Sequence, residues 1–173
     1  MSSAAIEVRP DEEIFAISRR VGDQLRERRQ TVAVAESCTG GLLGAAFTDV
    51  PGSSDYFLGG VIAYDNRVKI EQLGVPVEVL ERTGAVSAET AAAMASGVQR
   101  LLGADVGLSI TGVAGPGAEE HKPAGLTFIG LAGSESTSER HEWHGDRWNN
   151  RRQSVIAALS MLNRTLAGDD RRS

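Results

Sequence analysis

Apolar positions follow two spacings along this chain, short buried runs typical of strands and longer segments with helical periodicity. Ile14, Ile17, Val21 and Leu25 recur one helical turn apart in an otherwise charged segment, which predicts an amphipathic helix ending near residue 29. Further helical segments are predicted at 42–47, 66–73, 76–82, 88–102 and 146–168. Strands are predicted at 31–35, 58–64, 104–110, 125–132 and 137–143.

The order of these elements indicates the fold class. Strands alternate with helices up to residue 110, and the last two strands form a hairpin across Gly133–Ser136. This order predicts a single three-layer α/β/α domain with a mixed sheet. We expect the domain to span residues 11–167, between a flexible N-terminus at 1–10 and a flexible tail at 168–173.

Polar and glycine-rich turns follow three of the predicted strands, at Ser37–Gly41, Tyr64–Lys69 and Thr111–Gly117. Ligand sites of open α/β sheets form beyond the carboxyl ends of strands. We therefore expect these turns to converge on one pocket.

Composition narrows the class of protein. The 173 residues carry a formal net charge of −5, which argues against direct binding of nucleic acid or of an anionic membrane. Neither a membrane-spanning run nor a signal peptide is evident, so we expect a cytoplasmic protein. A single cysteine fits a reducing compartment and excludes a multi-cysteine metal cluster, and we expect no metal or cofactor.

The turn at 36–41 is the first candidate for chemistry. It offers Ser37 and Cys38 as nucleophiles, followed by Thr39, Gly40 and Gly41 at a helix start, where free amides bind an oxyanion or a phosphate. The plainer interpretation is that the hydroxyls only cap the helix and the glycines only form the turn. Cys38 is either a packing residue or a reactive thiol whose pKa the helix lowers.

Arginines cluster at the start of the last helix, where positive charge opposes the helix dipole. Arg147 and Arg151 share a face, and a phosphate or a protein carboxylate would satisfy them. For Arg151 and Arg152, a surface or subunit ion pair is as reasonable as phosphate binding.

Several motifs in order resemble one known family. They are A-E-S-C-T-G-G at 35–41, Y-D-N-x-x-K at 64–69, G-A-V-S at 84–87, T-G-V-A-G-P at 111–116, K-P-x-G at 122–125 and G-D-R-x-x-x-R-x-Q at 145–153. Their order and spacing resemble the C-terminal domain of CinA, the competence- and damage-inducible protein, over residues 11–167.

The resemblance implies a nicotinamide-nucleotide amidase, which converts nicotinamide mononucleotide to nicotinate mononucleotide and ammonia in pyridine nucleotide recycling. It places Ser37 in the site as nucleophile, Lys69 as base and Tyr64 as a helper, which agrees with the absence of an evident serine–histidine–aspartate set. Arg147 and Arg151 would reach the substrate phosphate. Thr111, Gly112 and Gly115 would line its ribose or phosphate side. A homodimer or higher homo-oligomer is also implied.

The sequence departs from the family pattern at two places, and two other functions are alternatives to the amidase. The loop 115–123 lacks the family's run of glycines and is one residue short, and Asn150 stands where an apolar residue is expected. One alternative is a nucleotide-binding or interaction module without catalysis, acting in competence or the response to DNA damage. The other, a metal-dependent hydrolase, would need His141 and His144 to converge, although three residues apart on a strand they face opposite sides.

Overall fold

The computed structural model describes residues 11–169. The predicted flexible segment 1–10 and most of the predicted tail, residues 170–173, lie outside the described residues. The last helix, α6 (Arg147–Asp169), runs one residue beyond its predicted end at Gly168. No helix among residues 11–169 has the length and apolar character needed to cross a membrane.

A single mixed sheet forms the centre of the molecule, in the strand order β2-β1-β3-β4-β5. The first three neighbours in this order run parallel, whereas β4 is antiparallel to β3 and β5 to β4. The mixed sheet and the terminal hairpin predicted from the sequence are therefore confirmed. The strands are β1 (Val32–Glu36), β2 (Phe57–Ile62), β3 (Val106–Gly112), β4 (Leu126–Ala132) and β5 (Ser136–Glu142).

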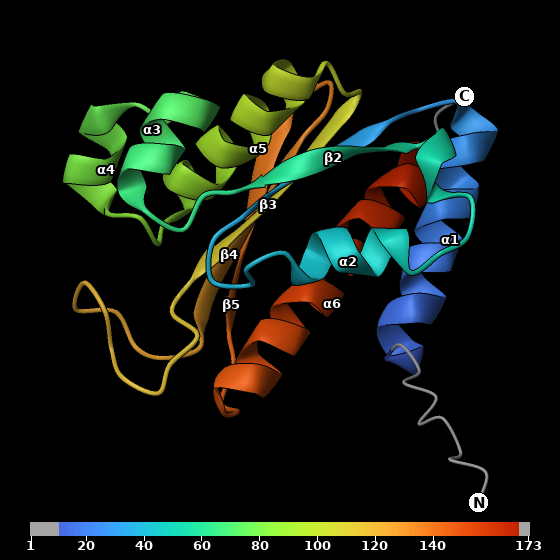
Figure 1. Cartoon of the computed structure of the whole chain (residues 1–173). Coiled ribbons are helices and arrows are strands. Elements are labelled where there is room, and N and C mark those ends of the chain that lie inside the picture. The colour runs from blue at the N-terminus through green and yellow to red at the C-terminus, as the bar shows by residue number, and fades with distance from the viewer. Residues whose placement is uncertain (1–10, 170–173) are drawn as a thin grey trace, which may run out of the picture.

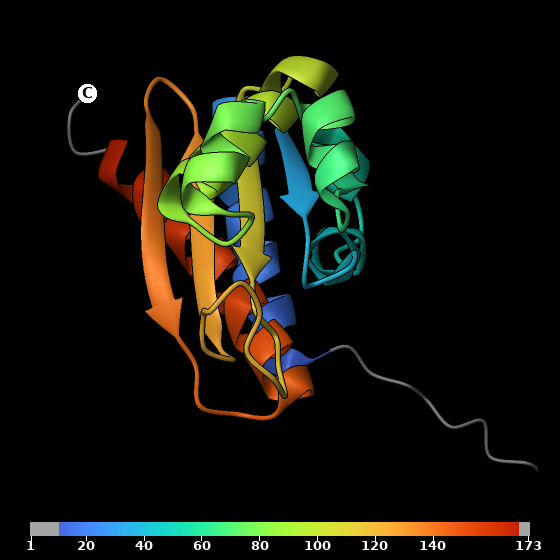
Figure 2. The same ribbon diagram turned by 90° about the vertical axis from the view of Figure 1, so that its left-hand side faces the viewer.

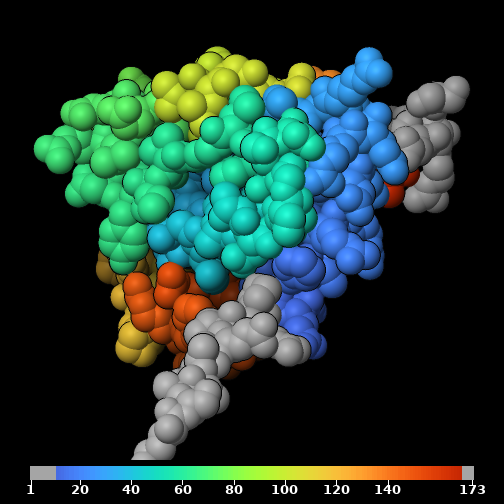
Figure 3. Space-filling view, turned by 45° about the vertical axis from the view of Figure 1, so that its right-hand side comes forward, coloured from blue at the N-terminus to red at the C-terminus, as the bar shows by residue number. Residues whose placement is uncertain are grey.

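Helices cover both faces of the sheet, which confirms the three layers (Figures 1 and 2). One face carries α1 (Glu12–Arg28), α2 (Leu42–Thr48) and α6, and the other carries α3 (Asn66–Leu73), α4 (Val77–Thr83) and α5 (Ala88–Leu102). A short 3-10 turn, η1 (Ser53–Asp55), leads into β2. In Figure 3 the segment from α2 to β2 lies at the surface between α1 and the α3–α4 pair.

The two helical layers pack on the sheet differently. Large aliphatic side chains of β1 and β3, such as Val34 and Leu108, fill the interface with α1, α2 and α6. On the other face α5 approaches so closely that a Cβ added at Gly107 or Gly130 would collide with its backbone carbonyls. Ser109 donates a hydrogen bond from Oγ to the Ala91 carbonyl of α5 at 2.6 Å.

Capping residues start and end several helices, close to the predicted bounds 66–73 and 88–102. Ser87 begins α5 by accepting a hydrogen bond from the Thr90 amide at 3.1 Å. Gly74 and Gly103 end α3 and α5 in the left-handed conformation, with φ of 64° and 63°. These caps fix where the polar turns between elements begin.

The carboxyl ends of β1 and β3 point to the same edge of the sheet, and the loop 113–125 lies beside them (Figure 2). The Ser37 amide donates to the Ile110 carbonyl at 3.0 Å, which joins the turn after β1 to β3. The Ala63 amide donates to the Glu36 carbonyl at 2.7 Å, which joins it to the segment after β2. Backbone pairing thus brings the three polar turns to one place.

Candidate active site

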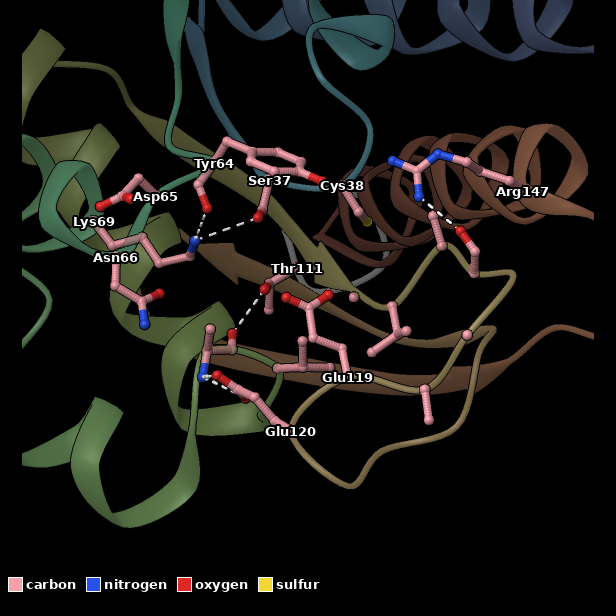
Figure 4. A pocket seen from close by; sticks show the side chains of 18 residues that line it. Ser37, Cys38, Tyr64, Asp65, Asn66, Lys69, Thr111, Glu119, Glu120 and Arg147 are labelled. Atoms are coloured by element: carbon pink, nitrogen blue, oxygen red, sulfur yellow. Dashed lines mark hydrogen bonds between the residues drawn. The ribbon is translucent and has the colours of Figure 1, made fainter.

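A pocket of about 570 Å³ opens at this edge of the sheet, and all three predicted turns contribute to it (Figure 4). Its volume is within the range of small-molecule sites. The predicted convergence is therefore confirmed. The residues that line the pocket and enter the argument below are Ser37, Cys38, Tyr64, Asp65, Asn66, Lys69, Thr111, Gly112, Gly115, Glu119, Glu120 and Arg147.

Ser37 and Lys69 form the central contact of the pocket. The Lys69 Nζ lies 3.3 Å from the Ser37 Oγ, and it donates to the carbonyls of Ala63 at 2.7 Å and Tyr64 at 3.0 Å. Both side chains are buried. A neutral amine has two N–H groups and one lone pair, so two donations to carbonyls leave the lone pair for the serine hydroxyl proton.

The surroundings of Lys69 favour that neutral form. Its side chain is only 1% exposed, and no carboxylate within the described residues forms an ion pair with it. Burial lowers the pKa of Lys69 below its ordinary value of 10.5, although the charge of Asp65 opposes the shift. Asp65 also caps α3 by accepting from the Arg67 amide at 2.8 Å. The arrangement can therefore activate a serine for attack on a carbonyl.

Tyr64 reaches the pocket from its rim. Tyr64 is 64% exposed. It lies beyond the end of β2, because the strand ends at Ile62, two residues before the predicted end at residue 64. Figure 4 shows its ring beside Ser37. The backbone carbonyl of Tyr64 holds Lys69, so this residue contributes to the site through its main chain as well as its ring.

Cys38 is unsuited to be the nucleophile. Its side chain is buried in the core shared with α6, and burial raises the pKa of its thiol from 9.0 to about 12. The neighbouring carboxylate of Glu36 raises it further. The thiol is therefore protonated near neutral pH, whereas thiol reactivity requires the thiolate.

Glu36 occupies the helix start that the sequence offered to a ligand. Its buried carboxylate accepts hydrogen bonds from the amides of Gly41 at 3.1 Å, Leu43 at 3.1 Å and Gly44 at 2.8 Å. The Gly40 amide donates to the Ser37 carbonyl at 3.1 Å. The expectation that Gly40 and Gly41 bind an anion is thereby corrected, because their amides already have partners.

Thr39 also lies outside the pocket. Its side chain is fully buried, and its Oγ1 has no hydrogen-bond partner within the described residues. Its carbonyl accepts from Arg151 at 2.9 Å, and the Cys38 carbonyl accepts from the same guanidinium at 3.1 Å. Arg151 thus supports the serine turn, with its guanidinium 5.5 Å from the centre of the Trp148 ring. The structure corrects the prediction that Arg151 contacts a phosphate.

Arg147 alone among the arginines of α6 lines the pocket. It donates from Nη1 to the Gly115 carbonyl at 2.7 Å, and its other N–H groups face no carboxylate within the described residues. Arg152 instead pairs with Asp11 and Glu13 of the α1 start. The ion pair predicted as the alternative therefore holds for Arg152, and Arg147 keeps donors for a ligand.

The loop after β3 forms the far wall of the pocket. Thr111, Gly112 and Gly115 line it as predicted, and the Thr111 hydroxyl donates to the Ala85 carbonyl at 2.7 Å. Asn150 is buried and stabilises this wall, because it donates to the Ala114 carbonyl at 3.0 Å and accepts from the Gly145 amide at 3.0 Å. Asn150, which stands where the family pattern has an apolar residue, thus joins α6 to the loop through polar contacts.

Sequence reasoning missed four polar residues of the pocket as binding candidates, which are Asp65, Asn66, Glu119 and Glu120. Asp65 and Asn66 belong to the motif Y-D-N-x-x-K at 64–69, and their position directly after a strand could have marked them as binding candidates. Glu119 and Glu120 lie in the loop that departs from the family pattern, and nothing in the sequence indicated which of the two side chains would be free to meet a ligand.

The histidine pair belongs to another part of the sheet. His141 lies on β5, stacked on Trp143 with ring centres 4.9 Å apart, and it is absent from the pocket lining. Within residues 11–169, no three side chains of histidine, cysteine, aspartate or glutamate are grouped to hold a metal ion. The described residues therefore give the metal-dependent alternative no ligand set.

Comparison with known proteins identifies the family. The family described as the CinA C-terminal domain matches residues 14–166 of this chain. The chain belongs to the CinA family. A CinA-like protein from Synechocystis sp. is 63% identical over 117 residues, which cover 67% of this chain and 28% of that protein.

Solved structures of the family share the fold. A CinA superfamily protein from Klebsiella pneumoniae is 31% identical with a TM-score of 0.87, covering 90% of this chain and 98% of that one. The competence/damage inducible protein CihA from Agrobacterium tumefaciens is 33% identical with a TM-score of 0.86, covering 94% and 99%. The chain spans about a third of the length of the curated relatives it matches.

Proposed function

We propose that this domain is a nicotinamide-nucleotide amidase that hydrolyses the carboxamide of nicotinamide mononucleotide, with Ser37 as nucleophile and Lys69 as base. The contact of 3.3 Å between Lys69 Nζ and Ser37 Oγ carries the proposal, because both groups are buried and the amine has its other donors on carbonyls. The family resemblance supplies the substrate, and the pocket has room for a mononucleotide.

The first half of the reaction forms an acyl-enzyme. Lys69 takes the hydroxyl proton as the Ser37 Oγ attacks the carboxamide carbon. The C–N bond then breaks while the Lys69 ammonium gives that proton to the departing NH2 group, which leaves as ammonia. The Cys38 amide directly follows the nucleophile and donates to no oxygen within the described residues. It is our candidate donor to the tetrahedral oxyanion.

The second half releases the product. Lys69 takes a proton from water, the hydroxide adds to the ester carbon, and the bond to the Ser37 Oγ breaks as the serine regains a proton. The new carboxylic acid ionises and leaves as nicotinate mononucleotide. Throughout both halves, Arg147 at the other side of the pocket provides free N–H donors for the phosphate (Figure 4).

The test is ammonia release from nicotinamide mononucleotide by the parent domain, by Ser37→Ala and by the exposed control Ser54→Ala, with and without a chelator. We expect chelator-resistant turnover by the parent and the control, and none by Ser37→Ala. A folded parent that binds the nucleotide without releasing ammonia would instead support the binding module. Homo-oligomerisation stays a prediction, which light scattering measures on the same samples.

A further inference from the structure

One charged group in the pocket has no task in the proposed reaction. Glu119 lines the pocket with an exposed side chain, and its carboxylate has no hydrogen-bond or ion-pair partner within residues 11–169. Its neighbour Glu120 is fully engaged, accepting from the Ala85 amide at 3.0 and 3.2 Å and pairing with Lys122 at 3.3 Å. The Glu120 carboxylate thus anchors the loop, whereas the adjacent Glu119 carboxylate lines the pocket.

The backbone around Glu119 is held in place by a tight turn. The Glu119 amide donates to the Lys122 carbonyl at 3.1 Å, and the Lys122 amide returns a hydrogen bond at 2.8 Å. The two central residues, Glu120 and His121, have φ of 51° and 60°, a conformation that is costly for residues other than glycine. Such a turn persists only where the surrounding contacts fix it.

Contacts to the end of α4 and to the segment that follows it provide that fixation. Besides the Glu120 contact with Ala85, the Lys122 Nζ donates to the Thr83 carbonyl at 2.7 Å. The turn is thereby anchored to the opposite rim of the pocket. The position of Glu119 is set before any ligand arrives, which is what a selective site requires.

The position of Glu119 relates to the parts of a nucleotide. In Figure 4, Ser37 and Lys69 lie on one side of the pocket, Arg147 lies on another, and Glu119 lies between them beside Thr111. With the carboxamide at Ser37 and the phosphate at Arg147, the ribose that joins them falls opposite Glu119. A carboxylate has two oxygens that accept hydrogen bonds, which matches two neighbouring ribose hydroxyls.

We propose that Glu119 is a specificity residue that accepts hydrogen bonds from the 2′- and 3′-hydroxyls of the substrate ribose. This inference rests on the proposed function, since it uses the orientation of the nucleotide between Ser37 and Arg147. The site then selects ribonucleotides over deoxyribonucleotides. Its negative charge also repels a phosphate from the middle of the pocket and so favours the orientation with phosphate at Arg147.

A different role for the carboxylate would be purely electrostatic. Glu119 would then act on the positive charge of the pyridinium ring or on Lys69, whose protonated form it favours together with Glu120. Such an effect does not depend on the ribose hydroxyls. It would change the rate for every nicotinamide nucleotide alike and would move the pH profile.

The experiment compares kcat/KM for nicotinamide mononucleotide and for its 2′-deoxy and 3′-deoxy analogues, using the parent, Glu119→Ala and Glu119→Gln. The exposed α1 residue Glu27 provides a charge-matched control as Glu27→Gln. We expect the parent to prefer the ribonucleotide by roughly 10- to 100-fold, the scale of hydrogen bonds to a charged group. In Glu119→Ala the preference should fall below about threefold, through KM, while Glu27→Gln should keep it.

Two results would overturn the inference. One is an unchanged preference in Glu119→Ala, and the other is a Glu119→Gln variant that slows all three substrates equally with a shifted pH profile. If the parent released no ammonia, the proposed function would fail separately. Calorimetric binding of the same three nucleotides to the same variants would then decide the role of Glu119, because it needs no turnover.

Discussion

The turn after β1 and the loop after β3 follow neighbouring parallel strands, yet they are held in opposite ways. In the turn, Glu36 binds three amides of the α2 start, and Arg151 binds the carbonyls of Cys38 and Thr39. The loop is anchored mainly near its tip by Glu120 and Lys122, and within residues 11–169 the Glu119 carboxylate has no hydrogen-bond or ion-pair partner.

The difference separates two requirements of a site. A nucleophile must be held in one geometry, and a turn whose polar groups are satisfied by the protein meets that requirement. A ligand must find polar groups that still need partners, and the loop and Arg147 offer them. We therefore expect damage to the turn to reduce kcat and stability, and damage to the loop to raise KM.

Lys69→Met should reduce turnover strongly. The variant keeps a long side chain in the buried site but has no proton acceptor, so we expect kcat for ammonia release to fall by about 10²- to 10⁴-fold. Lys69→Arg keeps the charge but cannot lose a proton, so it should be equally inactive. An active Lys69→Arg enzyme would show that the residue acts as a charge and not as a base.

Lys69→Met also serves to measure how the titration of Lys69 makes the stability of the protein depend on pH. Because burial lowers its folded pKa below 10.5, the unfolded chain binds more protons than the folded one between the folded pKa and about 10.5. In that window the free energy of unfolding of the parent should rise with pH relative to Lys69→Met, by about 1.4 kcal/mol for each unit that separates the two pKa values. Urea denaturation of both proteins at several pH values measures the difference, and parallel curves would contradict the lowered pKa.

Glu36→Ala tests the turn. It removes a buried carboxylate and leaves three amides of the α2 start without their acceptor, so we expect the free energy of unfolding to fall by about 3–5 kcal/mol. Glu36→Gln keeps one acceptor oxygen and should lose less. Urea denaturation measures both, and kcat at a temperature where the variants remain folded should fall without a matching rise in KM. A Glu36→Ala protein within about 1 kcal/mol of the parent would contradict this account.

The sequence predicts the fold and the contact between Ser37 and Lys69 better than it predicts the hydrogen bonding around them. Periodicity identifies strands and helices because burial follows it, and the motif order brings Ser37 and Lys69 together. The partners of Glu36 and Arg151 depend on how α2 and α6 pack, which the helical periodicity of those segments does not specify. One signal was present, since Val32, Val34 and Glu36 alternate along β1 and therefore share the face that α2 covers.

Gly84→Ala tests the loop and should have the smallest effect. Gly84 has a φ of 77°, and a Cβ there would collide with the Glu120 carboxylate and the Lys122 amine. The substitution should therefore loosen the anchor of the loop, raising KM for nicotinamide mononucleotide by about three- to tenfold while kcat stays near the parent value.

Gly103→Ala is the matched control for that substitution. Gly103 has a similar positive φ of 63°, but a Cβ there meets no atom within 4 Å. Both variants pay for a strained backbone, at about 1–3 kcal/mol, so a loss of stability alone does not distinguish them. Only the loop variant should change KM. Equal KM values for the two would mean that the anchor between Glu120, Lys122 and the segment before α5 does not position the groups that meet the substrate, and the division between a fixed turn and a receptive loop would then fail.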